Sequence, residues 1–496
     1  MPQVSIIIPV HNQPLLVLEA VDSLRVQSIG DWEAILVDDG STDETPMVLQ
    51  KLAAQDARIS LLVQTNKGAA AARNLGAANA KADWLLFLDS DDWLAPRAVE
   101  SLICAAGENI DLVHALGLRV CGPNSQSRSQ VQLPPKDDLF HRLTWTATFM
   151  VHACLLRRST FQELGGFDET LMGCADWDLW QRVVRSGARY AGVDEIVAFY
   201  RQTESSLSTN YGQELRDGLV VIDRGHGRDP RVVRPYPAYA EGAQRSAFSP
   251  AAYRFATWLG GLAIARNHPI EGILRGIQSI PAERLSAGDI AATLLDAIPI
   301  GLGDFRPDWE ACWPTLRPQL SKFLEKLGDT TRSGQDFVRE TLLATERLAA
   351  IANASDDGAC VGAMASRVVR IPGSIPHLDL GPNVTSFIAV VRTDRTELGQ
   401  LEAVVDPTFS GGKVREIVVE HYPRAVFSAY FKRFPASLIF GMIIHVTDWK
   451  NLLLSLANFV GSGSIAPSLR RQIAQALLAQ SFVLPVLDTT LIQRNT

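Results

Sequence analysis

The stretch Trp84-Leu-Leu-Phe-Leu-Asp-Ser-Asp-Asp-Trp93 decides the fold, because an apolar run ends abruptly in three carboxylates. The apolar run predicts a short strand that is buried on both faces of a sheet. In open α/β sheets, ligands bind in the crevice beyond the carboxyl ends of the strands. Asp89, Asp91 and Asp92 repel one another when ionised, so a divalent cation, Mg²⁺ or Mn²⁺, together with a phosphate-bearing ligand is expected there. The alternative is an acidic turn in which Ser90 or Asp92 caps the next helix.

Length and composition indicate an ordered protein of several domains. The chain has 496 residues, of which 47% are hydrophobic and 20% charged, which exceeds one compact core. A net charge of −7 without a clustered basic face argues against a nucleic-acid partner. The six cysteines lack zinc-ligand spacing, so no disulfide or structural zinc is expected. We find neither a signal peptide nor a membrane-spanning run, and we expect a cytoplasmic protein that is able to contact the inner face of a membrane peripherally.

Strands and helices alternate four times in the first 90 residues, which predicts a parallel, doubly wound α/β sheet. The expected strands are residues 4–10, 33–37, 59–63 and 84–88. Acidic side chains follow the second and fourth strands, and the segment after the third carries Lys67 and Arg73. Carboxylates for a metal and cations for a pyrophosphate are parts of a nucleotide site, although no glycine-rich phosphate-binding fingerprint is present.

Six motifs follow one another in order over the first two-fifths of the chain. They are Val4-Ser-Ile-Ile-Ile-Pro-Val-His-Asn12, Val37-Asp-Asp-Gly-Ser-Thr-Asp43, Asn66-Lys-Gly68 with Ala71-Ala-Arg-Asn-Leu-Gly76, Leu88-Asp-Ser-Asp-Asp92, Gly165-Gly-Phe-Asp-Glu169 and Ala175-Asp-Trp-Asp-Leu-Trp-Gln-Arg182. Together they resemble the GT-A nucleotide-sugar domain of family 2 inverting glycosyltransferases. The resemblance ends near residue 208.

The resemblance implies a role for each matching position. The donor-binding residues would be Pro9, His11, Asn12, Asp39, Lys67, Arg73 and Asp89. Within this set, the loop 9–12 and Asp39 would hold the base, and Asp89 would face the ribose. Asp91, in the Asp-x-Asp motif, would bind the metal that bridges the two phosphates, and Asp176 would be the catalytic base.

Inverting transfer makes the same chemical demands. A carboxylate must take the proton of the acceptor hydroxyl, and a Lewis acid must stabilise the departing diphosphate. The alternative for Asp176 is a first-turn acid that interacts with the helix dipole. Trp145, Asp178 and Trp180 are acceptor-site candidates, and His152 is either a core histidine or a residue that stacks on a sugar.

Two positions depart from the family pattern. Ala175 stands where family members commonly have Glu, which removes a hydrogen bond that would orient the acceptor. Thr203 stands where many relatives have a His that reaches the metal or the diphosphate. Threonine is a poor ligand for a divalent cation, so Asp91 and water would hold the ion with weaker affinity.

Three domains are expected: a GT-A domain over 1–215, a helical domain over 216–352 that starts with a basic linker, and a small α+β domain over 353–496. The linker arginines, at 224, 228, 231 and 234, are interpreted as solvated. Prolines at 269, 281, 299, 307, 314 and 318 predict short helices. In the last domain, strands are predicted over 387–391, 400–405 and 414–420 and helices over 449–459 and 467–482. Acceptor recognition or self-association is the expected duty of that part.

The leading hypothesis is a metal-dependent inverting glycosyltransferase. Its donor would be a nucleoside-diphosphate sugar, expected to be UDP-linked, and its acceptor a glycan, a lipid-linked glycan or a protein, as in polysaccharide biosynthesis. One alternative is a non-catalytic nucleotide-sugar or protein interaction module on a decayed transferase fold. A nucleotidyltransferase shares the metal carboxylates but needs a glycine-rich phosphate loop after the first strand, which is absent.

Overall fold

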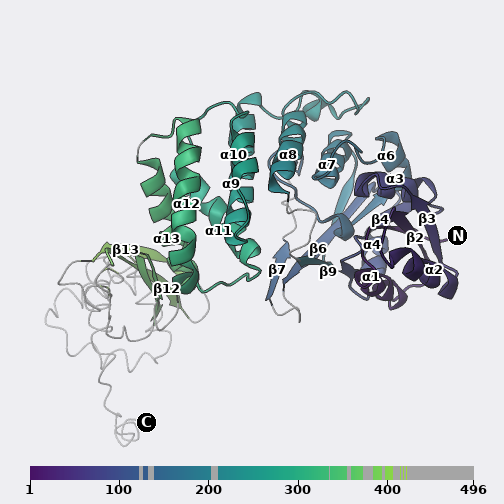
Figure 1. The fold of residues 1–496 in the computed structure, drawn as a ribbon, viewed down its shortest axis with the longest axis horizontal. Helices are drawn as coiled ribbons and strands as arrows, with labels where there is room; N and C mark the ends of the chain where they lie inside the picture. Colours follow the sequence, from purple (N-terminus) through teal and green to yellow (C-terminus); the bar gives the residue numbers. More distant parts are fainter. Residues whose placement is uncertain are drawn as a thin grey trace, which may run out of the picture. The chain divides into compact units, whose positions relative to one another are not determined.

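The computed structural model describes residues 1–121, 127–131, 139–202, 210–334, 336–354, 359–362, 364–371, 384–393 and 397–405, and also residues 414, 417 and 421. The chain divides into two compact units, one of residues 1–307 and 319–338 and the other of residues 308–318 and 339–496. The first unit contains the large sheet and most of the helices, and the second contains a small sheet (Figure 1). Domain limits at residues 215 and 352 stay a prediction.

Four parallel strands form one half of the large sheet and confirm the predicted alternation. They are β1 (Val4–Val10), β2 (Trp32–Asp39), β3 (Ile59–Gln64) and β4 (Trp84–Phe87), in the order β3-β2-β1-β4. β1 pairs in parallel with both β2 and β4, and Val10 lies beside Asp38 in this register. The polar ends of these strands therefore share one edge of the sheet.

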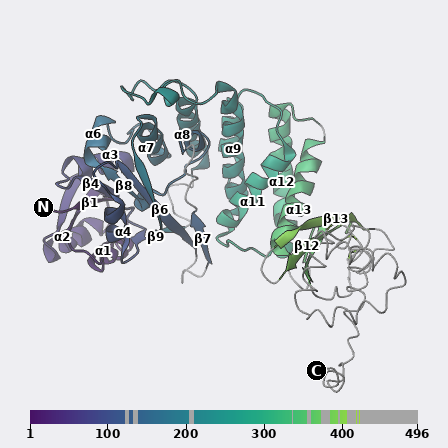
Figure 2. The same cartoon turned by 180° about the vertical axis from the view of Figure 1, so that it is seen from behind.

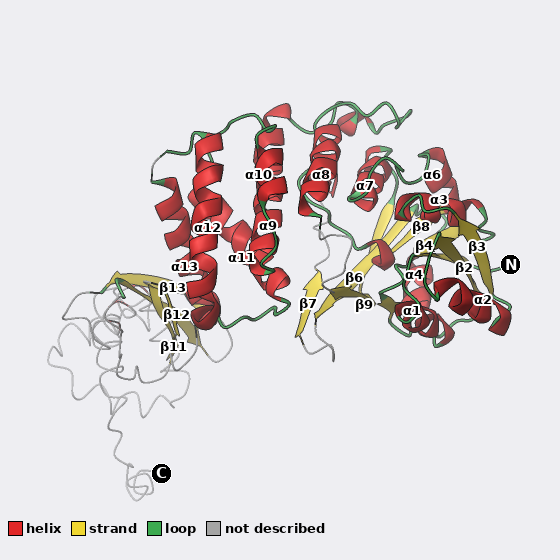
Figure 3. Cartoon of the chain, viewed as in Figure 1, coloured by secondary structure: helices red, strands yellow, loops and turns green. Residues whose placement is uncertain are grey.

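Mixed pairing extends the sheet beyond β4. β8 (Cys154–Arg157) runs antiparallel to β4, β6 (Leu112–Cys121) antiparallel to β8, and β9 (Tyr190–Gln202) parallel to β6. β7 (Ser127–Val131) pairs with β6 (Figure 3). The two-residue β5 (Trp93–Leu94) pairs with β9. The β5 pairing brings the end of β9 against the acidic turn that follows β4.

Helices cover both faces of the sheet because neighbouring strand residues point to opposite sides. Ile6 and Ile8 of β1 pack with the helices α1 (Leu16–Arg25), α2 (Thr45–Gln55) and α4 (Ala98–Ala105). Ile7 packs in a second cluster with α3 (Ala69–Ala78), α5 (Leu139–Leu143), α6 (Arg158–Glu163) and α7 (Ala175–Arg185). The reverse view shows α1 and α4 on one side of the sheet and α3, α6 and α7 on the other (Figure 2). The observed architecture is the predicted GT-A-like α/β sheet.

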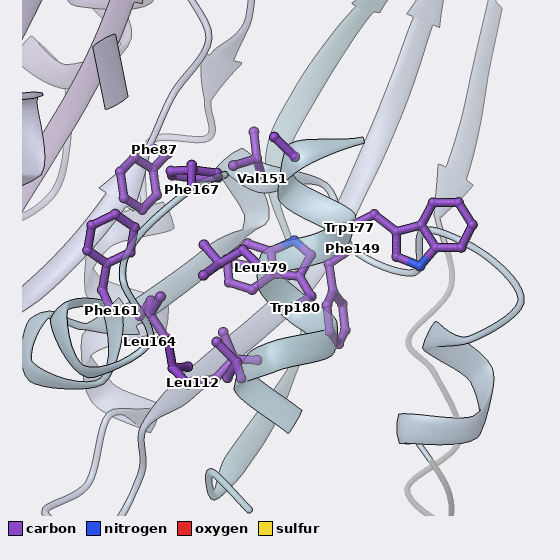
Figure 4. Close-up of a cluster of buried hydrophobic side chains, with 14 of the residues drawn as sticks. Phe87, Leu112, Phe149, Val151, Phe161, Leu164, Phe167, Trp177, Leu179 and Trp180 are labelled. Atoms are coloured by element: carbon purple, nitrogen blue, oxygen red, sulfur yellow. The ribbon is translucent and has the colours of Figure 1, made fainter. Parts of the chain in front are cut away.

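A cluster of large apolar side chains fixes α7 against the sheet (Figure 4). Phe87 of β4 meets Phe167 edge to face with ring centroids 4.9 Å apart. Trp180 of α7 meets Phe149 in the same way at 6.2 Å. Trp177 and Trp180 are both 0% exposed, and each large side chain buried in this way contributes roughly 1.5–3 kcal/mol. The helix that carries Asp176 is thus held firmly in place.

Gly76 allows α3 to lie close to β1. A Cβ atom at this position would lie 2.4 Å from Cγ2 of Ile7. We expect Gly76→Ala to lower the free energy of unfolding, measured in urea, by about 1–3 kcal/mol, because the core must shift to admit the methyl group. Gly288→Ala is the matched control, since its Cβ would meet nothing closer than 3.8 Å. Equal stability of the two variants would contradict the close packing.

Helices make up the rest of the first unit and part of the second. They are α8 (Tyr211–Gly225), α9 (Phe248–Ala265), α10 (Glu271–Ile277), α11 (Ala287–Leu302), α12 (Trp309–Thr331) and α13 (Phe337–Asn353). The prediction of only short helices is wrong, because Pro299, Pro314 and Pro318 lie inside helices. Each internal proline removes one backbone hydrogen bond, and buried side chains such as Leu294 and Ile298 of α11 offset this loss through packing. In the described part of the chain, no helix has both the length and the apolar character that a membrane span requires.

The second unit contains a four-stranded sheet in the order β10-β11-β12-β13. Its strands are β10 (Ala359–Val361), β11 (Met364–Ile371), β12 (Ser386–Thr393) and β13 (Glu397–Val404). β12 and β13 confirm the strands predicted over 387–391 and 400–405. Of the strand predicted over 414–420, only residues 414 and 417 are described, and both are helical. The helices predicted over 449–459 and 467–482 lie outside the described residues.

Candidate active site

The turn after β2 forms one wall of the site. Asp39 is buried, and its carboxylate accepts the backbone N–H groups of Lys67 and Gly68, both at 2.8 Å, and the amide of Gln64 at 2.7 Å. Gly40 has φ +70°, and a Cβ atom there would lie 2.6 Å from a backbone nitrogen of the loop after β3. Asp39 therefore ties the end of β2 to the start of α3, while the Lys67 side chain is exposed.

The other residues implied to bind the base lie beside this turn. Nδ1 of His11 lies 2.9 Å from the Asp39 carbonyl oxygen. Asn12 adopts a left-handed conformation with φ +52°, and its side-chain oxygen accepts the backbone N–H of Thr42 at 2.9 Å. Pro9 is buried inside β1. Local hydrogen bonds therefore bring His11, Asn12 and Asp39 together at one strand edge.

Arg73 of α3 interacts with carboxylates from two segments that are far apart in the sequence, the turn after β4 and the start of α7. Its guanidinium donates a hydrogen bond to Asp89. Burial alone would lower the pKa of Arg73, but the charges of Asp89, Asp176 and Asp91 outweigh it and raise the pKa. For the acid Asp89 the directions are reversed: burial alone would raise its pKa, but Arg73 lowers the pKa overall and keeps this carboxyl ionised. The turn after β4 and the start of α7 thus face one cation.

Asp176 lies in the first turn of α7 and is only partly buried. Burial raises the pKa of Asp176, while the charge of Arg73 opposes this shift and the charge of Asp89 adds to it. A partly exposed carboxylate can accept a proton from a bound hydroxyl. The charges of Asp176 and Asp89 therefore act on the same guanidinium, that of Arg73.

Asp92 contacts β9 and a buried histidine instead of capping a helix, since α4 begins at Ala98. Its Oδ1 accepts the backbone N–H of Arg201 at 2.7 Å, and its Oδ2 lies 3.1 Å from Nδ1 of His152. The ring of Tyr200 stacks on His152 with centroids 5.8 Å apart. Within the described residues, neither His152 nitrogen nor Oδ2 of Asp92 has a hydrogen bond of good geometry. The alternative in which Ser90 or Asp92 caps the next helix is therefore wrong, because the N-cap residue of α4 is Arg97.

One group of side chains in the described part of the chain could hold a metal ion. Asp89, Asp92 and His152 offer ligand atoms that all lie within 4.8 Å of one another. Burial lowers the pKa of His152 to about 4, so the imidazole is neutral near pH 7, which is the form that binds metals. Two carboxylates and an imidazole fit a divalent cation. Among their atoms, Oδ2 of Asp92 and both ring nitrogens of His152 are buried without a hydrogen-bond partner in the described part of the chain.

Solvent exposure divides the side chains around this candidate metal site into two pairs. Asp89 and Asp91 are partly exposed, and Asp92 and His152 are buried. Asp92 and His152 are each 1% exposed, so an ion bound by them alone would be shut off from a substrate. The Asp89 side chain is 27% exposed. Asp91 is outside the three-residue group but is partly exposed, and burial together with Asp89 raises its pKa to about 6. An ion that touches substrate phosphates would therefore need Asp89 or Asp91.

Two of the acceptor candidates lie inside the protein. Asp178 is 1% exposed and hydrogen-bonds Arg182 at 2.9 Å, Arg224 at 2.8 Å and Arg231 at 2.8 Å. Trp180 is 0% exposed. This placement gives both residues a packing role and does not support contact with an acceptor. The interpretation of Arg224 and Arg231 as solvated linker residues is wrong, because both bind Asp178.

Trp145 and Thr203 complete the set of sequence candidates. Trp145 is partly buried and packs against the same apolar cluster as α7. Its Nε1 atom is buried and has no hydrogen-bond partner among the described residues. Thr203 lies outside the described residues, so its effect on a metal stays a prediction.

Asn74 and Arg182 hold the Gly-Gly-Phe motif in a way that the sequence did not reveal. Asn74 exchanges two hydrogen bonds of 2.9 Å with the backbone of Phe167. Arg182 donates to the carbonyl oxygens of Leu164 at 2.6 Å and Gly166 at 2.7 Å. The Phe167 ring in turn lies 5.4 Å from the Arg73 guanidinium carbon. The sequence offered the order of the motifs as a signal for these residues, but motif order does not show which motifs are in contact.

Comparison with known proteins relates the first part of the chain to one protein family. Residues 5–165 match the family model described as Glycosyl transferase family 2. The chain is 30% identical over 217 residues to the uncharacterized glycosyltransferase EpsJ of Bacillus subtilis (strain 168), covering 42% of this chain and 63% of EpsJ. It is 37% identical over 112 residues to the putative glycosyltransferase EpsH of the same organism, covering 23% of this chain and 33% of EpsH.

A solved structure is similar over a longer stretch. The crystal structure of S. aureus TarS 1-349 in complex with UDP-GlcNAc is 16% identical, with a TM-score of 0.43, and the match covers 70% of this chain and 91% of that one. The chain spans only a third to somewhat under two thirds of the length of EpsH and EpsJ. Residues 5–165 are a glycosyltransferase family 2 domain.

Proposed function

We propose that this protein is a metal-dependent inverting glycosyltransferase. It would move a sugar from a nucleoside-diphosphate sugar, UDP-linked, to a hydroxyl of a glycan, a lipid-linked glycan or a protein. The observation that carries the proposal is the ion pair of Arg73 with Asp89, which ties α3 to the turn that carries Asp91, while the charge of Asp176 acts on the same guanidinium. This reaction needs a turn that binds the donor and a separate carboxylate that acts as the base, both at one place. The family 2 match supports glycosyl transfer as the reaction class.

Asp176 would act as the base of a single displacement. Its carboxylate takes the proton of the acceptor hydroxyl while the hydroxyl oxygen forms a bond to the anomeric carbon. The bond from that carbon to the diphosphate breaks on the opposite face, and its electron pair leaves with the nucleoside diphosphate. Asp89, kept ionised by Arg73, would accept a hydrogen bond from a ribose hydroxyl of the donor.

The residues present fit a divalent ion, Mn²⁺ or Mg²⁺. Asp91 and Asp89 would hold it on the accessible side, with Asp92 and His152 behind them. When bound, the ion would supply Lewis-acid stabilisation to the leaving diphosphate. Asp91 offers a carboxylate that is only partly buried and that Asp89 already disfavours as an anion, so a cation would relieve the repulsion.

Asp91→Ala should weaken binding of UDP in the presence of Mn²⁺ by about 10- to 100-fold, because a ligand of the ion is lost. Isothermal titration with UDP, with and without Mn²⁺, measures this change. Asp83→Ala is the matched control, since the Asp83 side chain is 85% exposed and lies just before the same strand. Equal UDP affinity of the Asp91→Ala variant and the wild type in Mn²⁺ would remove Asp91 from the metal site.

The reaction itself is tested with a panel of nucleotide sugars. Release of nucleoside diphosphate is measured with Mn²⁺, with Mg²⁺ and with a chelator, using the full chain. We expect one donor, a UDP-sugar, to be turned over in the presence of the metal and not in the presence of the chelator. Release from no donor above the level of the Asp176→Asn variant would contradict the proposal and favour the non-catalytic interaction module.

We propose roles for the parts of the chain that do not contribute residues to this site. Residues 1–215 would form the GT-A domain, 216–352 a helical domain and 353–496 a small α+β domain. The last of these would serve acceptor recognition or self-association, and the protein would work in the cytoplasm or at the inner face of a membrane. A truncation ending near residue 215 that kept full transfer to the native acceptor would contradict this division of labour.

A further inference from the structure

Helix α8 contacts the loop that leads into α7, although α8 lies beyond the residues matched by the family model. Asp217 of α8 is 5% exposed. Its Oδ2 atom accepts the backbone N–H groups of Met172 at 3.0 Å and of Gly173 at 2.8 Å. Its Oδ1 atom accepts the side-chain amide of Gln213 at 2.8 Å. One oxygen of this buried carboxylate thus holds the backbone of residues 172 and 173, and Gln213 of the same helix holds the other oxygen.

That backbone segment has a conformation that it would not adopt readily alone. Cys174 is the N-cap residue of α7 and has φ +57°, a left-handed conformation that is rare for a residue with a side chain. Its side chain makes no capping hydrogen bond. Such a residue costs on the order of 1–3 kcal/mol and persists only when its surroundings hold it. The two backbone N–H groups that donate to Asp217 directly precede Cys174, and Asp176 follows two residues later.

Glu214 lies on the face of α8 that meets the residues just before Asp176, because its backbone oxygen accepts a contact from Sγ of Cys174 at 3.9 Å. It precedes Asp217 by three residues and is therefore on the same side of the helix. Its Oε2 atom is buried and has no hydrogen-bond partner in the described part of the chain. Burial, followed by the charge of Asp176, raises the pKa of Glu214 to about 8, and Asp217 adds to the shift while Arg266 opposes it. A charge effect of this kind requires a short separation.

We propose that Asp217 of α8 fixes the backbone of residues 172–174 and thereby sets the position of Asp176, so that the catalytic unit includes α8. Asp217 is a positioning residue, since it acts through the loop and not on the substrate. This inference rests on the proposed role of Asp176 as the base. It moves the functional limit of the first domain beyond residue 215, to at least the middle of α8.

The test compares three substitutions in the full chain. Asp217→Ala removes both acceptor oxygens, and we expect kcat to fall by about 10- to 100-fold because the base is misplaced by a fraction of an ångström to an ångström. The KM for the nucleotide sugar should stay within about twofold, since the donor site is built from other elements. Asp217→Asn keeps one oxygen that can accept both N–H groups, so it should retain most of the activity. Asp223→Ala, on the same helix with a carboxylate 55% exposed, is the control and should behave as the wild type.

Hydrogen exchange of the backbone amides gives a readout that does not depend on activity. In Asp217→Ala, the amides of Met172 and Gly173 should lose protection, while those of β1 and β4 keep theirs. Gln213→Ala, which removes only the amide that holds the second oxygen, takes the place of Asp217→Ala if that variant does not fold, and a loss of about two- to fivefold in kcat is expected.

The outcomes separate this inference from the proposed function. If the wild type releases no nucleoside diphosphate from any donor of the panel, the proposed function fails, and amide exchange still decides whether Asp217 holds the loop. If the wild type is active while Asp217→Ala keeps both kcat and the protection of Met172 and Gly173, the inference alone is overturned. An equal fall of kcat in Asp217→Asn and Asp217→Ala would also overturn it, because the retained acceptor would then not matter.

Discussion

Asp176→Asn is expected to lower glycosyl transfer by about 10²- to 10⁴-fold, the range that a positioned general base contributes. The amide has nearly the same shape as the carboxylate but cannot take up the proton of the acceptor hydroxyl. Asp176 interacts with Arg73 and Asp89 through its charge. The hydrogen bond that holds the donor-side turn is the one from Arg73 to Asp89. Binding of the nucleotide should therefore be largely unchanged.

Two measurements on the same variant check this expectation. Turnover is measured as nucleoside diphosphate released in the presence of acceptor, and UDP affinity is measured by titration in Mn²⁺. Asp194→Asn, at an exposed position of β9, is the control for a charge-to-amide change and should leave both unchanged. Turnover by Asp176→Asn close to that of the wild type would show that another group takes the proton.

Asp178→Ala is expected to lower the free energy of unfolding by about 3–5 kcal/mol, the usual cost of removing one partner from a buried ion pair. The carboxylate is 1% exposed and accepts hydrogen bonds from Arg182, Arg224 and Arg231. Asp168 remains beside Arg224 at 2.9 Å and Arg231 at 3.1 Å, but Arg182, which is 2% exposed, would lose its carboxylate partner. Solvent cannot screen charges at this depth.

Urea unfolding of the variant distinguishes the two roles considered for Asp178. Asp22→Ala is the control, because the ion pair of Asp22 with Arg25 is at the surface and contributes at most about 1 kcal/mol. If Asp178→Ala were as stable as the wild type and lost only affinity for the acceptor, Asp178 would be an acceptor-site residue, which is the role considered for it from the sequence.

The sequence was sufficient for the four parallel strands because each is an apolar run with polar residues at its end. Runs such as residues 84–88 are buried on both faces, so they have no alternative environment in a folded chain. The acidic ends of β2 and β4 then follow from the parallel arrangement, since carboxyl ends of parallel strands share one edge. Motif order added Asp176, which composition alone would not have distinguished from a helix-start acid.

The contacts around Asp92 and Asp178 could not be predicted, because long-range pairing creates them. His152 reaches Asp92 only because β8 pairs antiparallel with β4, and no local spacing encodes that pairing. Arg224 and Arg231 looked solvated because their partner Asp178 is on another helix. The same holds for Asp217, whose role depends on a loop 44 residues earlier. Pairing between distant segments is set by tertiary packing, which single-sequence patterns do not contain.

We propose that residues 89, 91 and 176 face one nucleotide-sugar diphosphate. Diffraction data collected at the manganese absorption edge from crystals of the Asp176→Asn variant, grown with Mn²⁺ and the donor identified in the panel, test it most directly. We predict an anomalous peak beside Asp89 and Asp91 that contacts the diphosphate, with position 176 on the opposite face of the anomeric carbon. A manganese ion and diphosphate bound away from Asp89 and Asp91, or an anomeric carbon that faces away from α7, would contradict the account.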